Sequence, residues 1–201
     1  VGGAVFGNAQ AFGAKISESV EAVEVLDLET MQIRKINKKQ CKFSLKNSLF
    51  KKNKNFVIIS ALLNLKKRKK TIIKKKIIEY INYRKTKHPV KFSSAGSTFI
   101  NPEIKIRNKV LLKKFPELQE HNKRGIIPSG FLISRCGLAG KKSGSAQISE
   151  MHCNFIINLG GAKAKDVIYL MKLARKKVKK VFNISLVPEV QFLGFPEPPV
   201  K

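Results

Sequence analysis

Four short segments hold the residues of this chain that could do chemistry. They are residues 1–13, 95–102, 140–155 and 188–190. The second contains Ser97 in a run of small residues closed by Asn101 and Pro102, and the fourth contains the carboxylate of Glu189. A serine in such a turn most simply caps neighbouring backbone groups. For Ser97 to act as an acid, it would have to be oriented and given cationic or hydrogen-bonding neighbours.

The cysteine and histidine side chains outside these assignments suggest no catalytic or metal-binding function. The three cysteines have no paired spacing, which excludes a disulfide scaffold and a zinc knuckle, and we expect no metal site. His152 lies beside apolar residues and is assigned a structural role. No apolar run approaches the roughly 20 residues that span a bilayer, and the N-terminal residues do not show the pattern of n-region, h-region and cleavage site. We therefore expect a cytoplasmic protein without a membrane partner.

The charge of the chain is strongly basic. Lys and Arg number 41 against 13 acidic residues, which gives a formal net charge of +28. Residues 35–85 hold 18 of these cations and one acid, Glu79. Such a block attracts any polyanion and is released by salt. Because nearly all of its cations are lysines, whereas specific base readout and stacking favour Arg and exposed Tyr or Phe, we expect only non-specific contact with nucleic acid.

The segments must be positioned by elements that the sequence pattern predicts. Residues 1–13 are read as a glycine-rich turn, 20–28 and 31–33 as two strands of a hairpin, and 56–62 as a buried strand. Residues 65–83 are read as a lysine-coated helix that the Lys87-His88-Pro89 sequence ends. We place a domain boundary there, with domains at 1–86 and 87–201.

The second domain has clearer patterns. Residues 92–102 are read as a turn, 131–133 as a short apolar element, 137–144 as a loop, and 155–158 and 188–194 as strands. Residues 164–181 form the clearest helix, because apolar residues that include Met171 recur on one face and lysines crowd the last turns. Met171 is expected in the core. The fold class is therefore α+β.

The four segments, in this order and spacing, resemble the UDP-N-acetylenolpyruvoylglucosamine reductase family. Residues 1–4 and 8–13 look like its flavin-side glycine segment, and 95–102 look like its catalytic serine turn. Residues 140–155 are similar to its substrate-domain signature, and 188–190 to the strand that presents a glutamate. The resemblance covers nearly the whole chain but only the C-terminal two-thirds of a family member.

The resemblance implies a fold and an activity. Residues 1–86 would be part of an FAD-binding subdomain, and 87–201 a substrate-binding domain. In the family, NADPH reduces FAD, and the flavin passes hydride to the enolpyruvyl group to complete UDP-N-acetylmuramate for peptidoglycan. The expected cofactors are therefore FAD and NADPH, the expected partner is a nucleotide-sugar substrate, and the expected state is a monomer.

The resemblance also implies roles for individual residues. Ser97 would donate a proton, Glu189 would assist at the enol-like intermediate, and Lys46 would stabilise the developing negative charge. The flavin-side residues would be Gly2, Gly3, Ala4, Asn8 and Gly13. The residues facing the nucleotide sugar would be Lys87, Asn101 and Gln147, because a diphosphate and a carboxylate demand cations and amide donors.

The chain departs from the family pattern at several positions. Leu45 and Lys46 stand where the family carries a Tyr-Arg pair, so the charge is kept but the bidentate guanidinium is lost. Gln10 replaces a glycine and Ile100 replaces a lysine. The N-terminal loop that cradles the FAD diphosphate is expected to be missing. Two alternatives therefore stay open: a cationic nucleic-acid-binding protein, and an inactive truncated remnant of the reductase.

Overall fold

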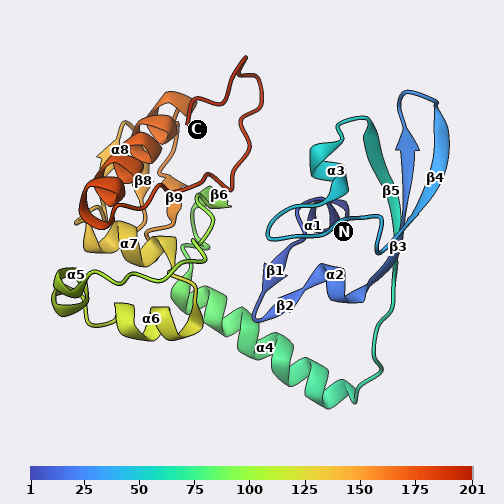
Figure 1. Ribbon diagram of the computed structural model, residues 1–201, viewed down its shortest axis with the longest axis horizontal. Helices are drawn as coiled ribbons and strands as arrows, with labels where there is room; N and C mark the ends of the chain where they lie inside the picture. The colour runs from blue at the N-terminus through green and yellow to red at the C-terminus, as the bar shows by residue number, and fades with distance from the viewer. Residues whose placement is uncertain (201) are drawn as a thin grey trace. The chain divides into compact units, whose positions relative to one another are not determined.

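The chain folds into two units that divide between Ile72 and Ile73, inside a long helix. The computed structural model describes residues 1–200. Figure 1 shows helices and strands in both units, which agrees with the mixed α and β composition expected from the sequence. The expected assignment of domains to 1–86 and 87–201 stays a prediction.

The first unit is built on a three-stranded antiparallel sheet in the order β4-β3-β5. Its elements are α1 (Gly2–Phe6), β1 (Gln10–Ala11), β2 (Ala14–Lys15), α2 (Ile16–Ser19), β3 (Val20–Asp27), β4 (Gln32–Asn37), α3 (Leu49–Lys52) and β5 (Phe56–Leu63). The central strand β3 supplies Val20, Val23 and Val25 to a small core that Val5 and Phe50 complete. The sequence-predicted hairpin is confirmed as β3 and β4.

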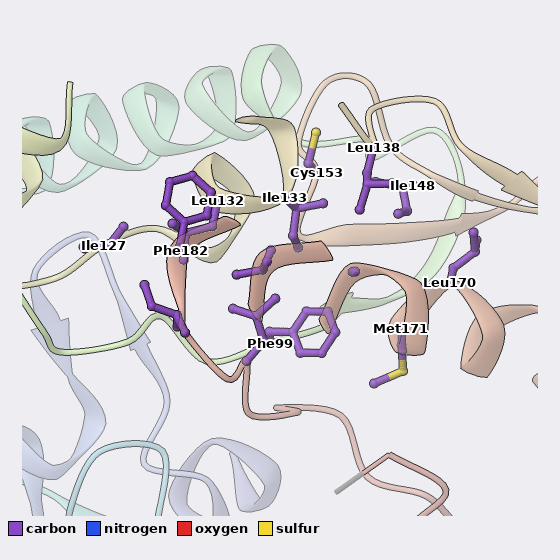
Figure 2. Close-up of a cluster of buried hydrophobic side chains, with 14 of the residues drawn as sticks. Phe99, Ile127, Leu132, Ile133, Leu138, Ile148, Cys153, Leu170, Met171 and Phe182 are labelled. Carbon is purple, nitrogen blue, oxygen red and sulfur yellow. The ribbon is translucent and has the colours of Figure 1, made fainter. Parts of the chain in front are cut away.

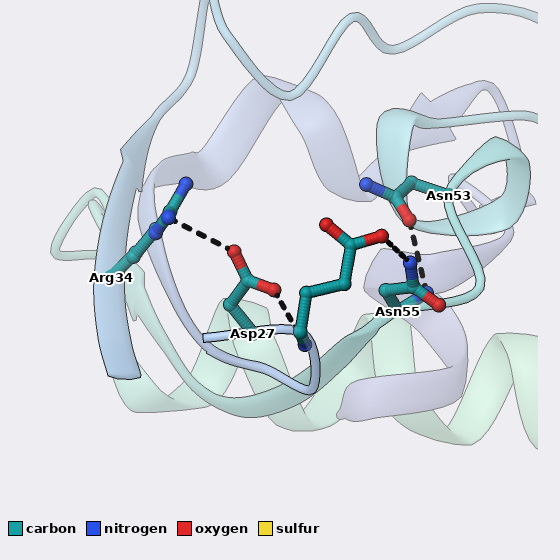
Figure 3. Close-up of polar contacts among 5 residues, drawn as sticks. Asp27, Arg34, Asn53 and Asn55 are labelled. Carbon is teal, nitrogen blue, oxygen red and sulfur yellow. Dashed lines mark hydrogen bonds and ion pairs between the residues drawn. The ribbon is translucent and has the colours of Figure 1, made fainter. Parts of the chain in front are cut away.

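The β3–β4 hairpin is closed by a polar network (Figure 3). The buried carboxylate of Asp27 pairs with Arg34 across the hairpin at 3.2 Å and accepts a hydrogen bond from the backbone N–H of Glu29 at 3.1 Å. The side chain of Glu29 in turn accepts a hydrogen bond from the amide of Asn55, at the start of β5. These contacts fix the turn and the entry of the third strand together.

Two sequence predictions for this unit are wrong. Residues 1–13 are not a simple turn, because Gly2–Phe6 forms helix α1, whose Val5 is buried in the core. Strand β5 is not buried, because it lies at the edge of the sheet and only alternate residues face the core. Its apolar run looked buried because both of its faces carry apolar residues, whereas Val57 and Ile59 are exposed.

Helix α4 (Lys70–Lys87) starts later and ends later than predicted, and it stops before His88 and Pro89 as expected. None of its residues is buried. Its isoleucines, at 72, 73, 77, 78 and 81, are between 42% and 58% exposed. The predicted apolar face therefore does not form, since lysines are distributed around the whole helix.

The second unit is built on a four-stranded antiparallel sheet in the order β6-β9-β8-β7. Besides the end of α4, its elements are β6 (Ser93–Ser97), α5 (Lys109–Lys114), α6 (Leu118–Arg124), α7 (Ser129–Arg135), β7 (Lys142–Ser143), β8 (Ala146–Ile148), β9 (Phe155–Asn158) and α8 (Ala164–Phe182). Strand β9 agrees with its predicted bounds, and α8 extends one residue beyond its predicted end. Residues 92–102 are not a turn alone, because they contain strand β6.

The core of this unit lies between the sheet and the helices. Figure 2 shows its side chains gathered from α7, α8 and the strands, with Phe99 among them. Met171 is fully buried there, as predicted. Residues 188–194 do not form the predicted strand and contribute one isolated bridge between Pro188 and Phe99. That bridge matters for the candidate site.

Candidate functional site

Ser97 is the last residue of the edge strand β6, where it pairs with Phe155 of β9. The pairing shifts register between Ser94 and Ser97, which marks a β-bulge. Gly96, inside the bulge, has φ +81°, a left-handed conformation that glycine adopts without steric cost. Bulges re-aim the side chain that follows them. The small residues that looked like a turn therefore set the direction of a half-buried Ser97.

Glu189 is brought to the same strand by backbone pairing. The N–H of Glu189 donates to the carbonyl of Thr98 at 2.8 Å, and the N–H of Ile100 donates to the carbonyl of Val187 at 2.9 Å. The Phe99–Pro188 bridge lies between these two bonds. The structure thus brings the segments that contain Ser97 and Glu189 together, although they are far apart in sequence.

Asn154 is the residue at this site that sequence reasoning missed. Its side chain bonds both backbone groups of Phe99, accepting from the N–H at 3.0 Å and donating to the carbonyl at 2.8 Å. It is 2% exposed. The signal available in the sequence was its place in the 140–155 signature, but no pattern within that segment singled it out.

Asn101 links the Ser97 segment to helix α7. Its side-chain oxygen accepts a hydrogen bond from the N–H of Ser129 at 2.9 Å, and the Ser129 hydroxyl donates to the carbonyl of Ile100 at 2.8 Å. The oxygen of the exposed Asn101 side chain is therefore already occupied by a hydrogen bond within the protein. No hydrogen bond of its NH2 group is found among residues 1–200. A substrate contact by Asn101 stays a prediction.

Gln147 lies in β8 and lines a cavity of about 330 Å³. Its side-chain nitrogen donates to the carbonyl of Gly140 at 3.1 Å. His88 and Pro89, which directly follow Lys87 at the end of α4, line the same cavity together with the cations Lys85 and Lys91. The structure therefore brings Gln147 and the turn after Lys87 to one hollow.

His88, in the wall of this cavity, belongs to a cluster of aromatic rings. The ring centroid of His88 lies 5.3 Å from that of His152 and 5.2 Å from that of Phe155. Burial lowers the pKa of His152 from its usual 6.5, and the nearby charge of His88 lowers it further. Burial also lowers the pKa of His88, with a contribution from Arg84. Both rings are thus biased toward the neutral state.

The flavin-side residues predicted from the sequence all lie in the first unit. Gly2, Gly3 and Ala4 belong to α1, and Gly13 has φ +78° between the short strands β1 and β2. Asn8 is buried, and its amide donates to the carbonyl of Ser44 at 2.8 Å and accepts from the N–H of Ser17 at 3.3 Å. Asn8 therefore has a structural role whatever else it contacts.

Lys46 lies in a tight turn of the same unit. Ser44 and Asn47 exchange backbone hydrogen bonds at 3.0 and 3.2 Å, and Lys46 between them has φ +51°. Its carbonyl accepts a hydrogen bond from the Lys51 ammonium at 3.1 Å. Through Ser44, Asn8 is bonded to this turn. The structure therefore joins two predicted parts of the site, the glycine segment and the Lys46 turn.

A second cavity of the second unit contains none of the predicted site residues. It measures about 530 Å³ and lies among β6, β9, the first half of α8 and residues 190–195. Its lining is mostly apolar, with Val167 and Met171 from α8 and Phe192 from the C-terminal segment. It adjoins the Ser97 segment through Thr98.

Residues 1–200 contain neither a cluster of potential metal ligands nor a candidate membrane-spanning helix. Across residues 1–200, no group of three or more His, Cys, Asp or Glu side chains could hold a metal ion. None of the helices in that range is long and apolar enough to cross a bilayer. The three cysteines are free thiols, as expected, with Cys41 and Cys153 buried.

Comparison with known proteins gives a consistent assignment. The sequence model of the UDP-N-acetylenolpyruvoylglucosamine reductase C-terminal domain matches residues 88–193. Proteins named UDP-N-acetylenolpyruvoylglucosamine reductase are 37% identical in Lachnoclostridium phytofermentans and 38% identical in Thermotoga sp.. These alignments cover 96% and 95% of this chain but 55% and 56% of the relatives, so the chain spans about half the length of the curated relatives it matches.

The fold agrees with the sequence comparison. The crystal structure of UDP-N-acetylenolpyruvylglucosamine reductase from Thermus caldophilus matches with a TM-score of 0.71 at 30% identity. The match covers 95% of this chain and 59% of that structure. Since the family model alone matches just over half of the residues, and relatives and fold agree with it, this chain belongs to the UDP-N-acetylenolpyruvoylglucosamine reductase family.

Proposed function

We propose that this chain is part of an NADPH-dependent flavoenzyme that reduces UDP-N-acetylenolpyruvoylglucosamine to UDP-N-acetylmuramate. The observation that carries the proposal is the backbone pairing of the Ser97 and Glu189 segments, in a chain whose relatives are named as this reductase. A proton donor and a carboxylate near one strand end suit an addition that builds negative charge on an enolpyruvyl group.

The first unit offers features that fit FAD. A Cβ atom built on Gly2, Gly3 or Gly13 would have no other heavy atom within 4 Å, so the surface at these glycines is open to close approach. The side-chain nitrogen of Gln10, in the same segment, is buried without a hydrogen-bond partner. An orphaned donor beside open glycines suits a ligand that carries carbonyl acceptors. We therefore assign flavin contact to residues 1–13, as part of an FAD-binding subdomain.

The chemistry divides between the cofactor and the residues of this chain. FAD reduced by NADPH would supply the hydride that bonds to the β-carbon of the enolpyruvyl double bond. Ser97 would give its hydroxyl proton to the α-carbon as the π bond breaks, and Glu189 would assist that protonation. The cationic Lys46 would stabilise the negative charge that develops on the substrate. The Ser97 oxygen would regain its proton from solvent.

Substrate binding is assigned to the second unit. The cavity at Gln147 and the turn after Lys87 combines an amide with the cations Lys85 and Lys91, beside the carboxylate of Glu150, and amides and cations are the groups that a nucleotide-sugar diphosphate requires. The free NH2 group of Asn101 could contact the substrate while its oxygen holds Ser129. We further propose that the protein acts as a monomer in the cytoplasm, in peptidoglycan synthesis. Its lysine-rich surface would meet nucleic acid only non-specifically.

The test is a titration of this chain with FAD, followed by flavin fluorescence at two salt concentrations. Saturable quenching that persists at high salt is expected, since a formed pocket holds the cofactor by more than charge. NADPH oxidation on addition of the enolpyruvyl substrate should follow. Quenching that vanishes with salt would show only attraction of an anion to a chain of net charge +28, and would contradict flavin binding by this chain.

A further inference from the structure

Asn154 has an unusual share of the hydrogen bonds around the predicted catalytic segments. Its carbonyl accepts from the N–H of Thr98 at 2.7 Å, and its side chain bonds both backbone groups of Phe99. Thr98 in turn accepts the N–H of Glu189. One buried asparagine is thus bonded to the two residues that directly follow Ser97, and through Thr98 it is connected to Glu189.

Asn154 is itself held by His152. The backbone N–H of Asn154 donates to Nδ1 of His152 at 3.3 Å, so Nδ1 must keep its lone pair for this bond to exist. The N–H of His152 donates to the hydroxyl of Ser149 at 3.3 Å, and this bond fixes the start of the turn formed by residues 149–154. Residues 149–154 therefore form a hydrogen-bonded turn, and this turn contacts the residues after Ser97 through Asn154.

The ring of His152 is confined by packing on several sides. Its centroid lies 4.9 Å from that of Phe155 and 5.3 Å from that of His88. On another side lies Gly130 of α7, where an added Cβ would come within 3.1 Å of the ring. Because these contacts restrict the ring, its Nδ1 stays in place to accept the N–H of Asn154. The confined ring thereby holds Asn154 in position.

We propose that Asn154 is a positioning residue that holds Thr98 and Phe99, and thereby orients Ser97 and Glu189, with the His152 ring fixing Asn154. This inference rests on the proposed roles of Ser97 and Glu189. The roles that the family resemblance implies for individual residues of this chain do not include one for Asn154. Asn154 would touch neither the substrate nor the cofactor and would act only through the backbone of its neighbours.

Protonation of His152 should weaken this support. Burial and the charge of His88 both lower the pKa of His152, which favours the neutral ring that can accept at Nδ1. The charged or titratable groups around the pair are Tyr83, whose ring centroid lies 6.1 Å from that of His88, Arg84, which acts on His88, and Lys85, Lys91 and Glu150, which line the cavity beside it. The three cations among them oppose a proton on the rings, and the carboxylate of Glu150 favours one.

A matched pair of variants tests the proposal in the full chain. Asn154→Ala removes two side-chain bonds to Phe99. Asn158→Ala, at the end of strand β9, which directly follows Asn154, removes two side-chain bonds to Gly160 and Ala162. Each variant loses two side-chain-to-backbone hydrogen bonds, but those of Asn154 are buried and those of Asn158 are exposed, so the unfolding midpoint should fall further in Asn154→Ala. Only Asn154→Ala should shift the amide NMR signals of Ser97, Thr98 and Glu189 and speed their hydrogen exchange, by about tenfold for each net bond lost.

Unchanged signals of Ser97 and Glu189 in folded Asn154→Ala would overturn the proposal, as would equal shifts in both variants. If Asn154→Ala does not fold, a pH titration of the unaltered chain decides. The amide signals of Asn154, Thr98 and Phe99 should then move with the same midpoint as the ring signals of His152. A ring that titrates while these amides stay fixed would contradict the support role. Neither readout needs FAD, so failure of the proposed function would appear separately, in the flavin titration.

Discussion

The carbonyl oxygen of Thr98 accepts the backbone N–H of Glu189 at 2.8 Å, which joins two segments that lie far apart in the sequence. The bond does not depend on either side chain. Substitutions of Ser97 or Glu189 should therefore leave the pairing in place and can report on chemistry alone. Ser97, one residue before Thr98, follows a bulge that sets its direction.

Replacing Ser97 by alanine should separate the two halves of the proposed reaction. The loss of the hydroxyl removes the proton donor, so substrate reduction should fall by roughly 10²–10⁴. Reduction of bound flavin by NADPH should be unchanged, because it needs no proton from Ser97. Stopped-flow absorbance of the flavin measures both steps. Ser93→Ala, on the same strand, serves as the control, and equal loss of both steps in Ser97→Ala would contradict the assignment.

Replacing Lys46 by arginine should raise turnover of the enolpyruvyl substrate. Arginine restores a planar donor pair that contacts a carboxylate with two parallel hydrogen bonds, whereas lysine offers a single ammonium. A gain of several-fold, up to about tenfold, corresponds to one improved charge-assisted hydrogen bond. Lys52→Arg, in the neighbouring helix α3, is the matched control. No change in Lys46→Arg would remove Lys46 from the site.

Gly144 should tolerate alanine far less than Gly125, although both have positive φ values, of +50° and +70°. A Cβ on Gly144 would lie 2.7 Å from the carboxylate of Asp166, which accepts the N–H of Lys163 at the start of α8. A Cβ on Gly125 meets no atom within 4 Å. We expect about 1–2 kcal/mol of destabilisation for Gly125→Ala from backbone strain alone and about 2–4 kcal/mol for Gly144→Ala. Urea unfolding measures both, and equal losses would contradict the steric argument.

Stability should fall as the pH is lowered below the usual histidine pKa of 6.5. Burial lowers the pKa of His88, His121 and His152, so the unfolded chain binds protons more tightly than the folded chain does. Stability from these groups is complete above 6.5 and is lost as pH falls toward their lowered values. Urea midpoints between about pH 7.5 and 5.5 should decrease, and the decrease should shrink when the histidines are replaced by glutamine. A flat profile would contradict the prediction.

The three thiols should differ in reactivity. Burial raises the pKa of Cys41 from 9.0 to about 11, so near neutral pH its thiolate fraction is roughly 100-fold below that of an exposed cysteine. Burial also raises the pKa of Cys153 and of Cys136, but the Cys136 side chain is only half-buried and is therefore more accessible to a reagent than the buried Cys41 and Cys153. A thiol reagent at pH 8 should therefore modify Cys136 first and the other two only after unfolding. Rapid loss of all three thiols in the folded chain would contradict this order.

The elements that the sequence predicted well are those fixed by local pattern. Helix α8 combines an apolar face with lysines near its end, and Asn183 with φ +56° follows it, so its bounds could be read within about a residue. Strand β9 is a short apolar run between turn residues. The residues of the predicted catalytic segments were found by resemblance, since nothing in the spacing of Ser97 or Glu189 alone distinguishes them from polar surface.

The elements that were missed depend on partners distant in the chain. Ser93–Ser97 looks like a turn because its residues are small, and it becomes a strand only through pairing with Phe155–Asn158. Gly2–Phe6 looks like a turn because of its glycines, yet burial of Val5 against the sheet stabilises a helical turn. Asn154 likewise gains its role from Phe99, which local sequence cannot indicate.

The lack of any buried residue in α4 has a consequence for proteolysis of this protein. An isolated 18-residue helix with no buried side chain is only marginally stable in water, so its backbone opens often. Lysines at 66, 67, 69 and 70 and at 74–76 place trypsin sites throughout this region. Brief digestion should therefore cleave first around α4 and leave two fragments, each retaining its own hydrophobic core.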